Sequence, residues 1–93
     1  MTSLRIELGL ALRQHRVAIG VSQERLGELS GLDRTYISGI ERAVRNPTID
    51  SLSRIAEALE CELSELLAAA ETARDTRVPK AKAKRNPGSG SAK

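Results

Sequence analysis

The chain has 93 residues, of which 40% are hydrophobic and 29% are charged, and this length and composition describe one small globular domain. No apolar run approaches the ~18 residues of a membrane span and no signal-peptide pattern opens the sequence, so we expect a cytoplasmic protein. The net charge of +3 is unevenly distributed, because residues 1–76 carry nine basic and twelve acidic residues, whereas the remainder carries six basic residues and no acidic one.

The first predicted helix covers residues 4–19 and ends at Gly20, since glycine readily adopts the left-handed conformation that stops a helix. Its apolar face consists of Leu8, Leu12, His15 and Ile19. Since the sequence has no second histidine, we expect His15 to be a partly buried structural residue.

The sequence shows no candidate catalytic or metal site. Cys61 is the only cysteine, and packing is its expected role. Without a nucleophile and base set, a metal cluster or a phosphate-binding glycine loop, the sequence predicts no enzymatic activity, no cofactor and no metal.

Two short helices joined by a tight turn are predicted between Ser22 and Arg42. Ser22 and Asp33 are the expected N-caps, because their side-chain oxygens accept hydrogen bonds from free N–H groups of the first helical turn. An apolar residue precedes each cap and another lies four positions after it, and this spacing staples the helix entry. Ser30 and Gly31 break the chain between the helices. The pattern therefore predicts a helix-turn-helix.

The second helix of this pair presents a polar face that contains no carboxylate and no bulk at its centre. A helix fits the major groove of DNA, which is ~12 Å wide, and Arg and Thr side chains match the hydrogen-bonding edges of bases. We therefore predict base contacts from Arg34, Thr35 and Ser38. A solvated amphipathic face is the alternative interpretation, which the caps, the turn and the paired faces together disfavour. The polar face consists of Arg34, Thr35, Ser38, Gly39 and Arg42.

A fourth helix is predicted after Pro47, with Thr48 as its N-cap. This helix closes the core, because its apolar residues recur at helical spacing. Arg54 lies on its polar side and is expected to be a solvated surface charge. The predicted buried set is Ile49, Leu52, Ile55, Ala56 and Leu59.

A fifth helix is predicted from about Leu63 to Ala70. Since four helices already form a core, we predict that Leu63, Leu66 and Leu67 lie in a dimer interface; completion of the monomer core is the alternative. Residues 76–93 are rich in Lys, Pro, Gly and Ser and are expected to form a disordered basic tail. Residues 1–75 would then form the domain for DNA binding and dimerisation.

The segment from Leu8 to Leu67 resembles the lambda-repressor-like regulators of the Cro/C1 or XRE type. The matching runs are LGLALRQHR, GVSQERLGELSGL, RTYISGIER, RNPTIDSL, IAEALE and SELL. The run DRTYISGIER followed by RNPTI is especially similar to the controller proteins of restriction-modification systems. The resemblance implies an all-α, compact five-helix fold and a transcriptional regulator that binds double-stranded DNA as a homodimer on a partly palindromic operator.

The resemblance also implies roles for individual residues. Arg16 is expected to pair with Glu41 and to tie the first helix to the recognition helix. Gln23 begins the second helix, whose positive end favours a phosphate. The expected contacts to the DNA backbone come from Gln23, Tyr36, Arg42, Arg45 and Asn46.

Three positions depart from the family pattern. Ala43 stands where relatives commonly have glycine, so the end of the recognition helix is poorly signalled. Glu60 also replaces a common glycine, and Glu62 replaces a capping Ser or Asp. The connection between the fourth and fifth helices is therefore expected to be atypical.

A controller protein would act on its own promoter and on the restriction endonuclease gene, with a switch between activation and repression as bound dimers accumulate. RNA polymerase is then a further candidate partner. The alternatives are a generic XRE-type repressor of a phage or an operon, and an antitoxin that binds a toxin and autoregulates its operon. An antitoxin usually devotes an added segment to its toxin, and the only candidate segment here is the Lys-rich tail.

Overall fold

The structure of the protein is a computed structural model that describes residues 4–77. The described part is all-α, as the sequence predicts. Of the predicted basic tail, residues 76–93, only Thr76 and Arg77 are described, and both belong to the last helix; the rest of the tail lies outside the described residues. The helices are α1 (Leu4–Ala18), α2 (Gln23–Ser30), α3 (Arg34–Glu41), α4 (Ile49–Ala58) and α5 (Leu63–Arg77).

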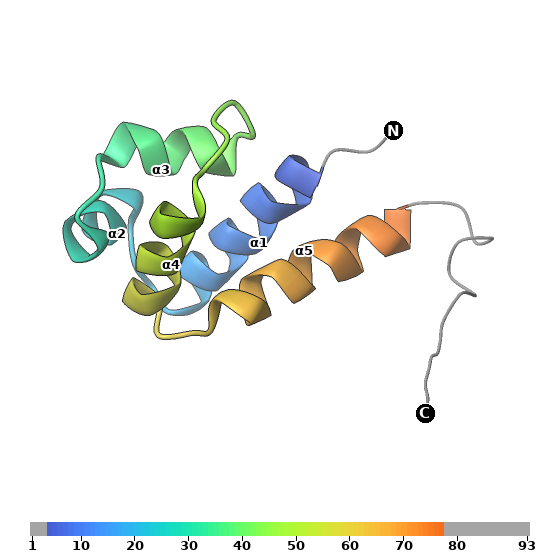
Figure 1. Ribbon diagram of the computed structural model, residues 1–93. Coiled ribbons are helices and arrows are strands. Elements are labelled where there is room, and N and C mark those ends of the chain that lie inside the picture. Colours follow the sequence, from blue (N-terminus) through green and yellow to red (C-terminus); the bar gives the residue numbers. More distant parts are fainter. Residues whose placement is uncertain (1–3, 78–93) are drawn as a thin grey trace.

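The longest helices, α1 and α5, lie side by side and run in opposite directions (Figure 1). α1 also packs against α3, and α2 packs against both α3 and α4. α3 lies at the outer edge of the molecule, where one of its sides faces away from the other helices (Figure 1). This arrangement leaves the outer side of α3, the helix predicted to contact DNA bases, exposed.

The three predicted N-caps are present. Ser22, Asp33 and Thr48 accept hydrogen bonds from backbone N–H groups of the first turns of α2, α3 and α4, at 2.9, 3.0 and 3.0 Å. The predicted turn between α2 and α3 is also confirmed, because Gly31 has a φ of 76° and its N–H donates to the carbonyl oxygen of Gly27 at 2.9 Å. Local sequence signals therefore define the helix-turn-helix.

Within residues 4–77, two residues other than glycine adopt the left-handed conformation at helix ends. Ala43 has a φ of 63° after α3, and Glu60 has a φ of 59° after α4. Both stand at positions where the resembled family often has glycine, so the chain keeps the glycine geometry at a steric cost of about 1–2 kcal/mol each. α5 begins after Glu62, where the resembled family has a capping Ser or Asp. The Glu65 carboxylate accepts the backbone N–H of Glu62 at 2.9 Å and so satisfies one donor at this helix start.

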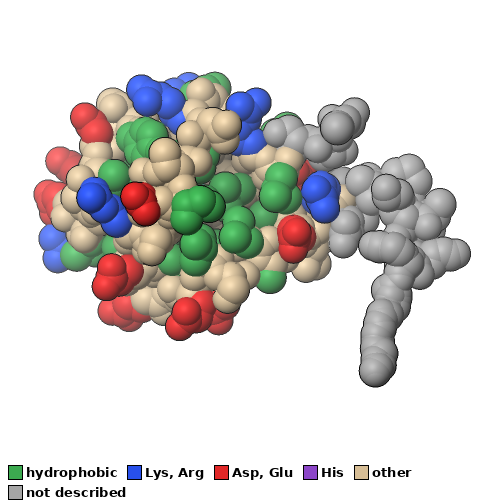
Figure 2. All heavy atoms as spheres, viewed as in Figure 1, with side chains coloured by type: hydrophobic (Ala, Val, Ile, Leu, Met, Phe, Trp, Pro, Cys, Tyr) green, Lys and Arg blue, Asp and Glu red, His purple; other side chains and the backbone are tan. Residues whose placement is uncertain are grey.

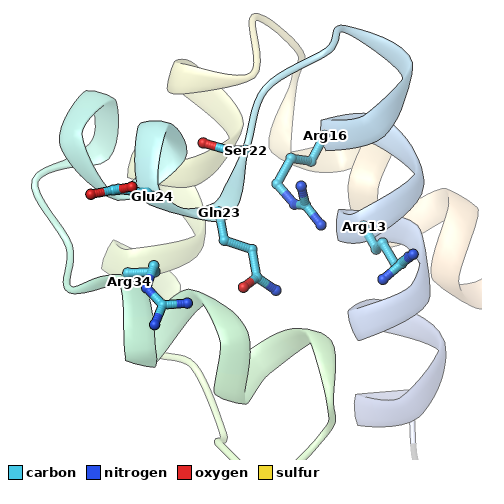
Figure 3. Close-up of a pocket in the computed structure, with 6 residues that line it drawn as sticks. All are labelled: Arg13, Arg16, Ser22, Gln23, Glu24 and Arg34. Carbon is cyan, nitrogen blue, oxygen red and sulfur yellow. The ribbon is translucent and has the colours of Figure 1, made fainter.

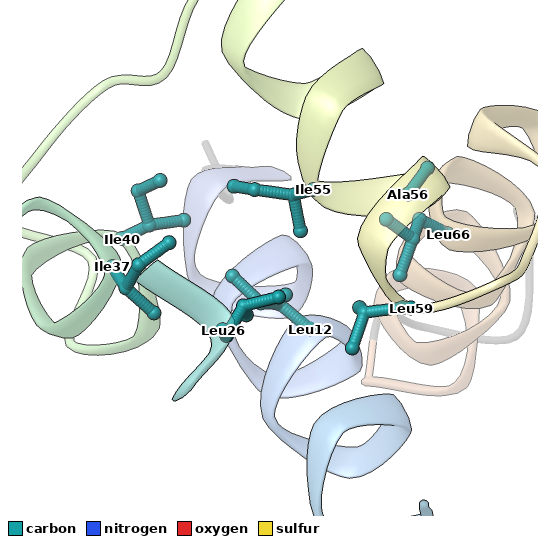
Figure 4. Packing of buried hydrophobic residues seen from close by; sticks show 8 residues of the cluster. All are labelled: Leu12, Leu26, Ile37, Ile40, Ile55, Ala56, Leu59 and Leu66. Carbon is teal, nitrogen blue, oxygen red and sulfur yellow. The ribbon is translucent and has the colours of Figure 1, made fainter. Parts of the chain in front are cut away.

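The main core draws side chains from all five helices (Figure 4). A second, smaller cluster joins α1, α4 and α5, and it consists of Leu8, Ala11, Leu52 and Ala70. The main core holds α3 against the other helices, because Ile37 and Ile40 on its apolar side belong to this cluster. The main core consists of Leu12, Leu26, Ile37, Ile40, Ile55, Ala56, Leu59 and Leu66.

Three sequence predictions about the helices were wrong. Ile19 was predicted on the buried face of α1, but the helix ends at Ala18, and the turn into Gly20 leaves Ile19 49% exposed. Ile49 was predicted in the core, but this first residue of α4 is 67% exposed. α5 continues past Ala70 to Arg77, because Ala, Glu and Arg favour helix there and proline follows only at position 79.

Candidate nucleic-acid interface

α3 divides into a core side and an outer side. Ile37 and Ile40 are fully buried in the main core. Arg34 and Thr35 at the start of the helix are exposed, and Ser38 one turn later is half-buried. The structure thus brings the three predicted base-contacting residues onto the outer part of one short helix.

The cap residue Asp33 bonds to Thr35 twice. Its Oδ1 accepts the backbone N–H of Thr35 at 3.0 Å and the hydroxyl of Thr35 at 2.9 Å. These two hydrogen bonds, the backbone one first, lower the pKa of Asp33 below its ordinary value, and the charge of Arg34 contributes to the same direction. Asp33 therefore remains a carboxylate at neutral pH and holds Thr35 in place.

The centre of the predicted polar face differs from the sequence prediction. Gly39 was predicted to be an open position without bulk, but it is buried, and a Cβ atom there would collide with the aliphatic stem of Arg45. The guanidinium of Arg45 lies 5.7 Å from the centre of the Tyr36 ring, within the range of a cation–π contact. The Tyr36 hydroxyl donates to Oγ of Ser51 at 3.2 Å. The side chain of Arg45 therefore packs over α3 at Gly39 and Tyr36, although Arg45 itself lies in the loop after this helix.

A buried network joins α1, α2 and α3. Arg16 donates from Nε and Nη2 to the two carboxylate oxygens of Glu41, at 2.6 and 3.0 Å, and from Nη1 to the carbonyl oxygen of Val21 at 2.9 Å. Gln23 donates from Nε2 to Glu41 at 3.0 Å. The hydrogen bonds that Arg16 donates to Glu41 raise the pKa of Arg16, although burial opposes this shift. One N–H of the Gln23 amide is thus occupied inside the protein.

A recess of about 490 Å³ lies between α1 and the starts of α2 and α3. Figure 3 shows the side chains of Arg13, Gln23 and Arg34 extending toward this space from three different helices, whereas Glu24 points away. The sequence prediction did not include Arg13, because nothing in the pattern of α1 distinguishes it from any other exposed arginine. The recess is lined by Arg13, Arg16, Ser22, Gln23, Glu24 and Arg34.

The remaining predicted residues lie in two places. Arg42 and Asn46 are exposed, the first as the C-cap of α3 and the second in the loop before α4. Leu63 and Leu67 are half-buried on α5. Leu66 was predicted in the dimer interface, but its side chain is 0% exposed in the main core, so it has no surface to offer a second copy.

The described residues show few features of other functional classes. They contain no group of His, Cys, Asp and Glu side chains that could hold a metal ion. None of their helices is long and apolar enough to cross a membrane. Burial raises the pKa of the Cys61 thiol, which keeps it protonated at neutral pH and suits a packing role.

A capped helix held outward by a tight turn on a small helical scaffold is the geometry of a helix-turn-helix DNA-binding domain. The sequence matches the helix-turn-helix family over residues 12–66, more than half of the chain. The protein therefore belongs to this family, of the Cro/C1 or XRE type, whose members regulate transcription and are not enzymes. The predicted lambda-repressor-like fold is confirmed.

Individual relatives narrow the resemblance. The chain is 45% identical to control protein C.SmaI of Serratia marcescens over 56 residues, which are 60% of this chain and 67% of that protein. The restriction-modification controller protein C.AhdI of Aeromonas hydrophila has 45% sequence identity to this chain. Its crystal structure superposes with a TM-score of 0.66 over 67% of this chain and 94% of that one. The clp gene regulator ClgR of Corynebacterium glutamicum is 27% identical, with a TM-score of 0.80 over 90% and 89% of the two chains. The protein is thus a DNA-binding transcriptional regulator that resembles restriction-modification controllers.

Proposed function

We propose that this protein is the controller of a restriction-modification system. It binds a partly palindromic operator as a homodimer in the bacterial cytoplasm and regulates its own promoter and that of the endonuclease. The observation that carries this proposal is the identity of 45% both to C.SmaI and to C.AhdI. RNA polymerase is the proposed further partner, because a controller that switches from activation to repression must act on polymerase in both states.

Footprinting tests this proposal directly. The protein is titrated onto DNA from upstream of its own gene and of the neighbouring genes, and protection is expected at a site with two related halves. Protection upstream of a restriction endonuclease gene supports the controller function. Protection confined to an operon without restriction and methylase genes would instead support the second candidate, a regulator of another operon, which the similarity to ClgR favours.

Arg34 is the proposed main base contact. It is exposed at the start of α3, and a bidentate pair between arginine and guanine contributes about 1–3 kcal/mol of discrimination. Arg34→Ala is expected to weaken operator binding by roughly tenfold to a hundredfold, with a much smaller effect on scrambled DNA. Arg34→Lys should restore binding only in part, since lysine lacks the planar fork. A competition titration on both DNAs at one salt concentration measures the difference. Equal losses on both would assign Arg34 to phosphate binding.

Arg13 is proposed to bind a phosphate together with the other donors of the recess. Arg13→Ala is expected to weaken binding to operator and scrambled DNA alike and to reduce the slope of log affinity against log salt by about 0.9. Arg25→Ala is the matched control, because Arg25 is an exposed arginine of α2 that pairs with Glu28 outside the recess. An unchanged slope for Arg13→Ala, or the same decrease in both variants, would contradict a phosphate contact at Arg13.

The dimer interface is proposed on α4 and α5. Hydrophobic side chains gather at the centre of one face over α1, α4 and α5 (Figure 2). On α4 and α5 the structure exposes Ile49 and leaves Leu63 and Leu67 half-buried. A groove of about 370 Å³ lies between α4 and the start of α5, and it is lined by Ser53, Ala56, Glu57, Cys61, Glu62 and Leu63.

Leu67→Asp tests this interface. The charge would enter an apolar contact between two copies, so we expect a folded monomer with weak operator binding. Sedimentation at micromolar concentration measures the state, and circular dichroism checks the fold. Leu29→Asp is the control, because Leu29 is an exposed leucine of α2 outside the proposed interface. A Leu67→Asp dimer as stable as the wild type would overturn the proposed interface.

A further inference from the structure

The hydroxyl group of Thr35 has a fixed direction in this structure. Its oxygen lies 2.9 Å from Oδ1 of Asp33, and that same Oδ1 accepts the backbone N–H of Thr35 at 3.0 Å. An ionised carboxylate only accepts hydrogen bonds, so the hydroxyl must be the donor. The backbone and side-chain bonds to one oxygen also hold the Thr35 side chain in a single orientation.

The rest of the Thr35 side chain is exposed on the outer part of α3. With its hydrogen directed at Asp33, the hydroxyl retains only its lone pairs for a ligand. In the major groove the hydrogen-bond donors are the exocyclic amino groups of adenine and cytosine, whereas guanine N7 and O6 and thymine O4 are acceptors. A free threonine hydroxyl serves either kind of edge because it can rotate.

We propose that Thr35 reads its base only as a hydrogen-bond acceptor, from the amino group of an adenine or a cytosine, and that Asp33 is the positioning residue that sets this polarity. The proposal rests on sequence-specific DNA binding through α3. Asp33 thus has two roles, since the same oxygen that caps α3 also removes the donor capacity of its neighbour. At the position that Thr35 contacts, a base that presents an acceptor meets two opposed lone pairs and is rejected.

Binding selections from randomised duplex DNA test the proposal. The wild type is expected to select one position per half-site at which Thr35→Val relaxes the preference, because valine lacks the hydroxyl. Asp33→Ser should relax the same position, since serine can still cap α3 but can also accept the Thr35 hydrogen or release it. Asp33→Asn should keep the preference, because its amide oxygen can accept both bonds. Thr35→Ser should also keep it.

Titrations with single duplexes then measure the size of the effect. We expect the wild type and Asp33→Asn to prefer the selected base over the base that presents an acceptor by about threefold to tenfold, the range of one hydrogen bond. Asp33→Ser should reduce this ratio to nearly one, whereas the preference at the position read by Arg34 remains. Thermal melts verify that each variant is folded.

The outcomes separate this inference from the proposed function. If the wild type selects no sequence, sequence-specific binding itself fails. If the wild type selects a site, but Asp33→Ser keeps the preference that Thr35→Val loses, Asp33 does not set the polarity and the inference is overturned. Relaxation of every position in Asp33→Ser would likewise overturn it, because that result would show a general effect of the cap on α3.

Discussion

Glu41→Ala is expected to lower the free energy of unfolding by about 3 kcal/mol, because it leaves the Arg16 guanidinium without its counter-charge. The two side chains are only 10% and 4% exposed, and both form further hydrogen bonds inside the protein. The expected loss lies at the lower end of the range for buried pairs, since the adjoining recess allows water to reach Arg16. Urea unfolding of the wild type and the variant measures it.

The chain contains a matched control for this prediction. Arg25 and Glu28 form an ion pair at 3.0 Å on α2, with side chains 59% and 61% exposed. Glu28→Ala should cost about 0.3–0.5 kcal/mol, the usual value of an exposed helical pair. The double variant Arg16→Met with Glu41→Leu should recover most of the stability, because no buried charge remains unpaired. Equal small losses from Glu41→Ala and Glu28→Ala would show that burial does not strengthen the Arg16 and Glu41 pair.

Leu66→Asp is expected to unfold the protein. Leu66 is completely buried among the side chains of the main core, and an isolated carboxylate there costs several kcal/mol. A domain with a total stability of about 5–15 kcal/mol, small domains being at the lower end, does not tolerate such a loss. Circular dichroism at 25 °C should show the loss of helix.

Leu67→Asp is the neighbouring control, because Leu67 is only half-buried and belongs to the proposed dimer interface. This variant should retain its helix content and lose its partner. A folded, monomeric Leu66→Asp protein would contradict the core position of Leu66 and would support the sequence prediction that Leu66 lies in the dimer interface.

The leucine pattern of α5 does not distinguish core residues from interface residues. The spacing of Leu63, Leu66, Leu67 and Ala70 identifies an apolar face of a helix, but it does not say whether that face meets the same chain or another one. The structure divides the face, with Leu66 and Ala70 buried in the protomer and Leu63 and Leu67 at its surface. The division depends on how α5 is rotated against α1 and α4, which is a property of packing.

The sequence alone determined the features that depend on residues close together in the chain. The three N-caps, the left-handed turn at Gly31 and the outward side of α3 follow from hydrogen bonds and side-chain periodicity within one or two helical turns. The family resemblance added the Arg16 and Glu41 pair, which the structure contains at 2.6 Å. The same local signals identified Asp33 as a cap, whereas the second hydrogen bond, which the Thr35 hydroxyl donates to Asp33, became evident only in the structure.

Only the tertiary structure decided which distant residues meet. Arg13 lines one recess with Arg34 because α1 packs against α3, and the stem of Arg45 covers Gly39 because the loop after α3 folds back over it. Ile19 and Ile49 fit the helical period and are nevertheless exposed. Periodicity defines the side of a helix on which a residue lies, but burial requires a second element opposite that residue, and at the ends of α1 and α4 the rest of the described chain provides too little cover.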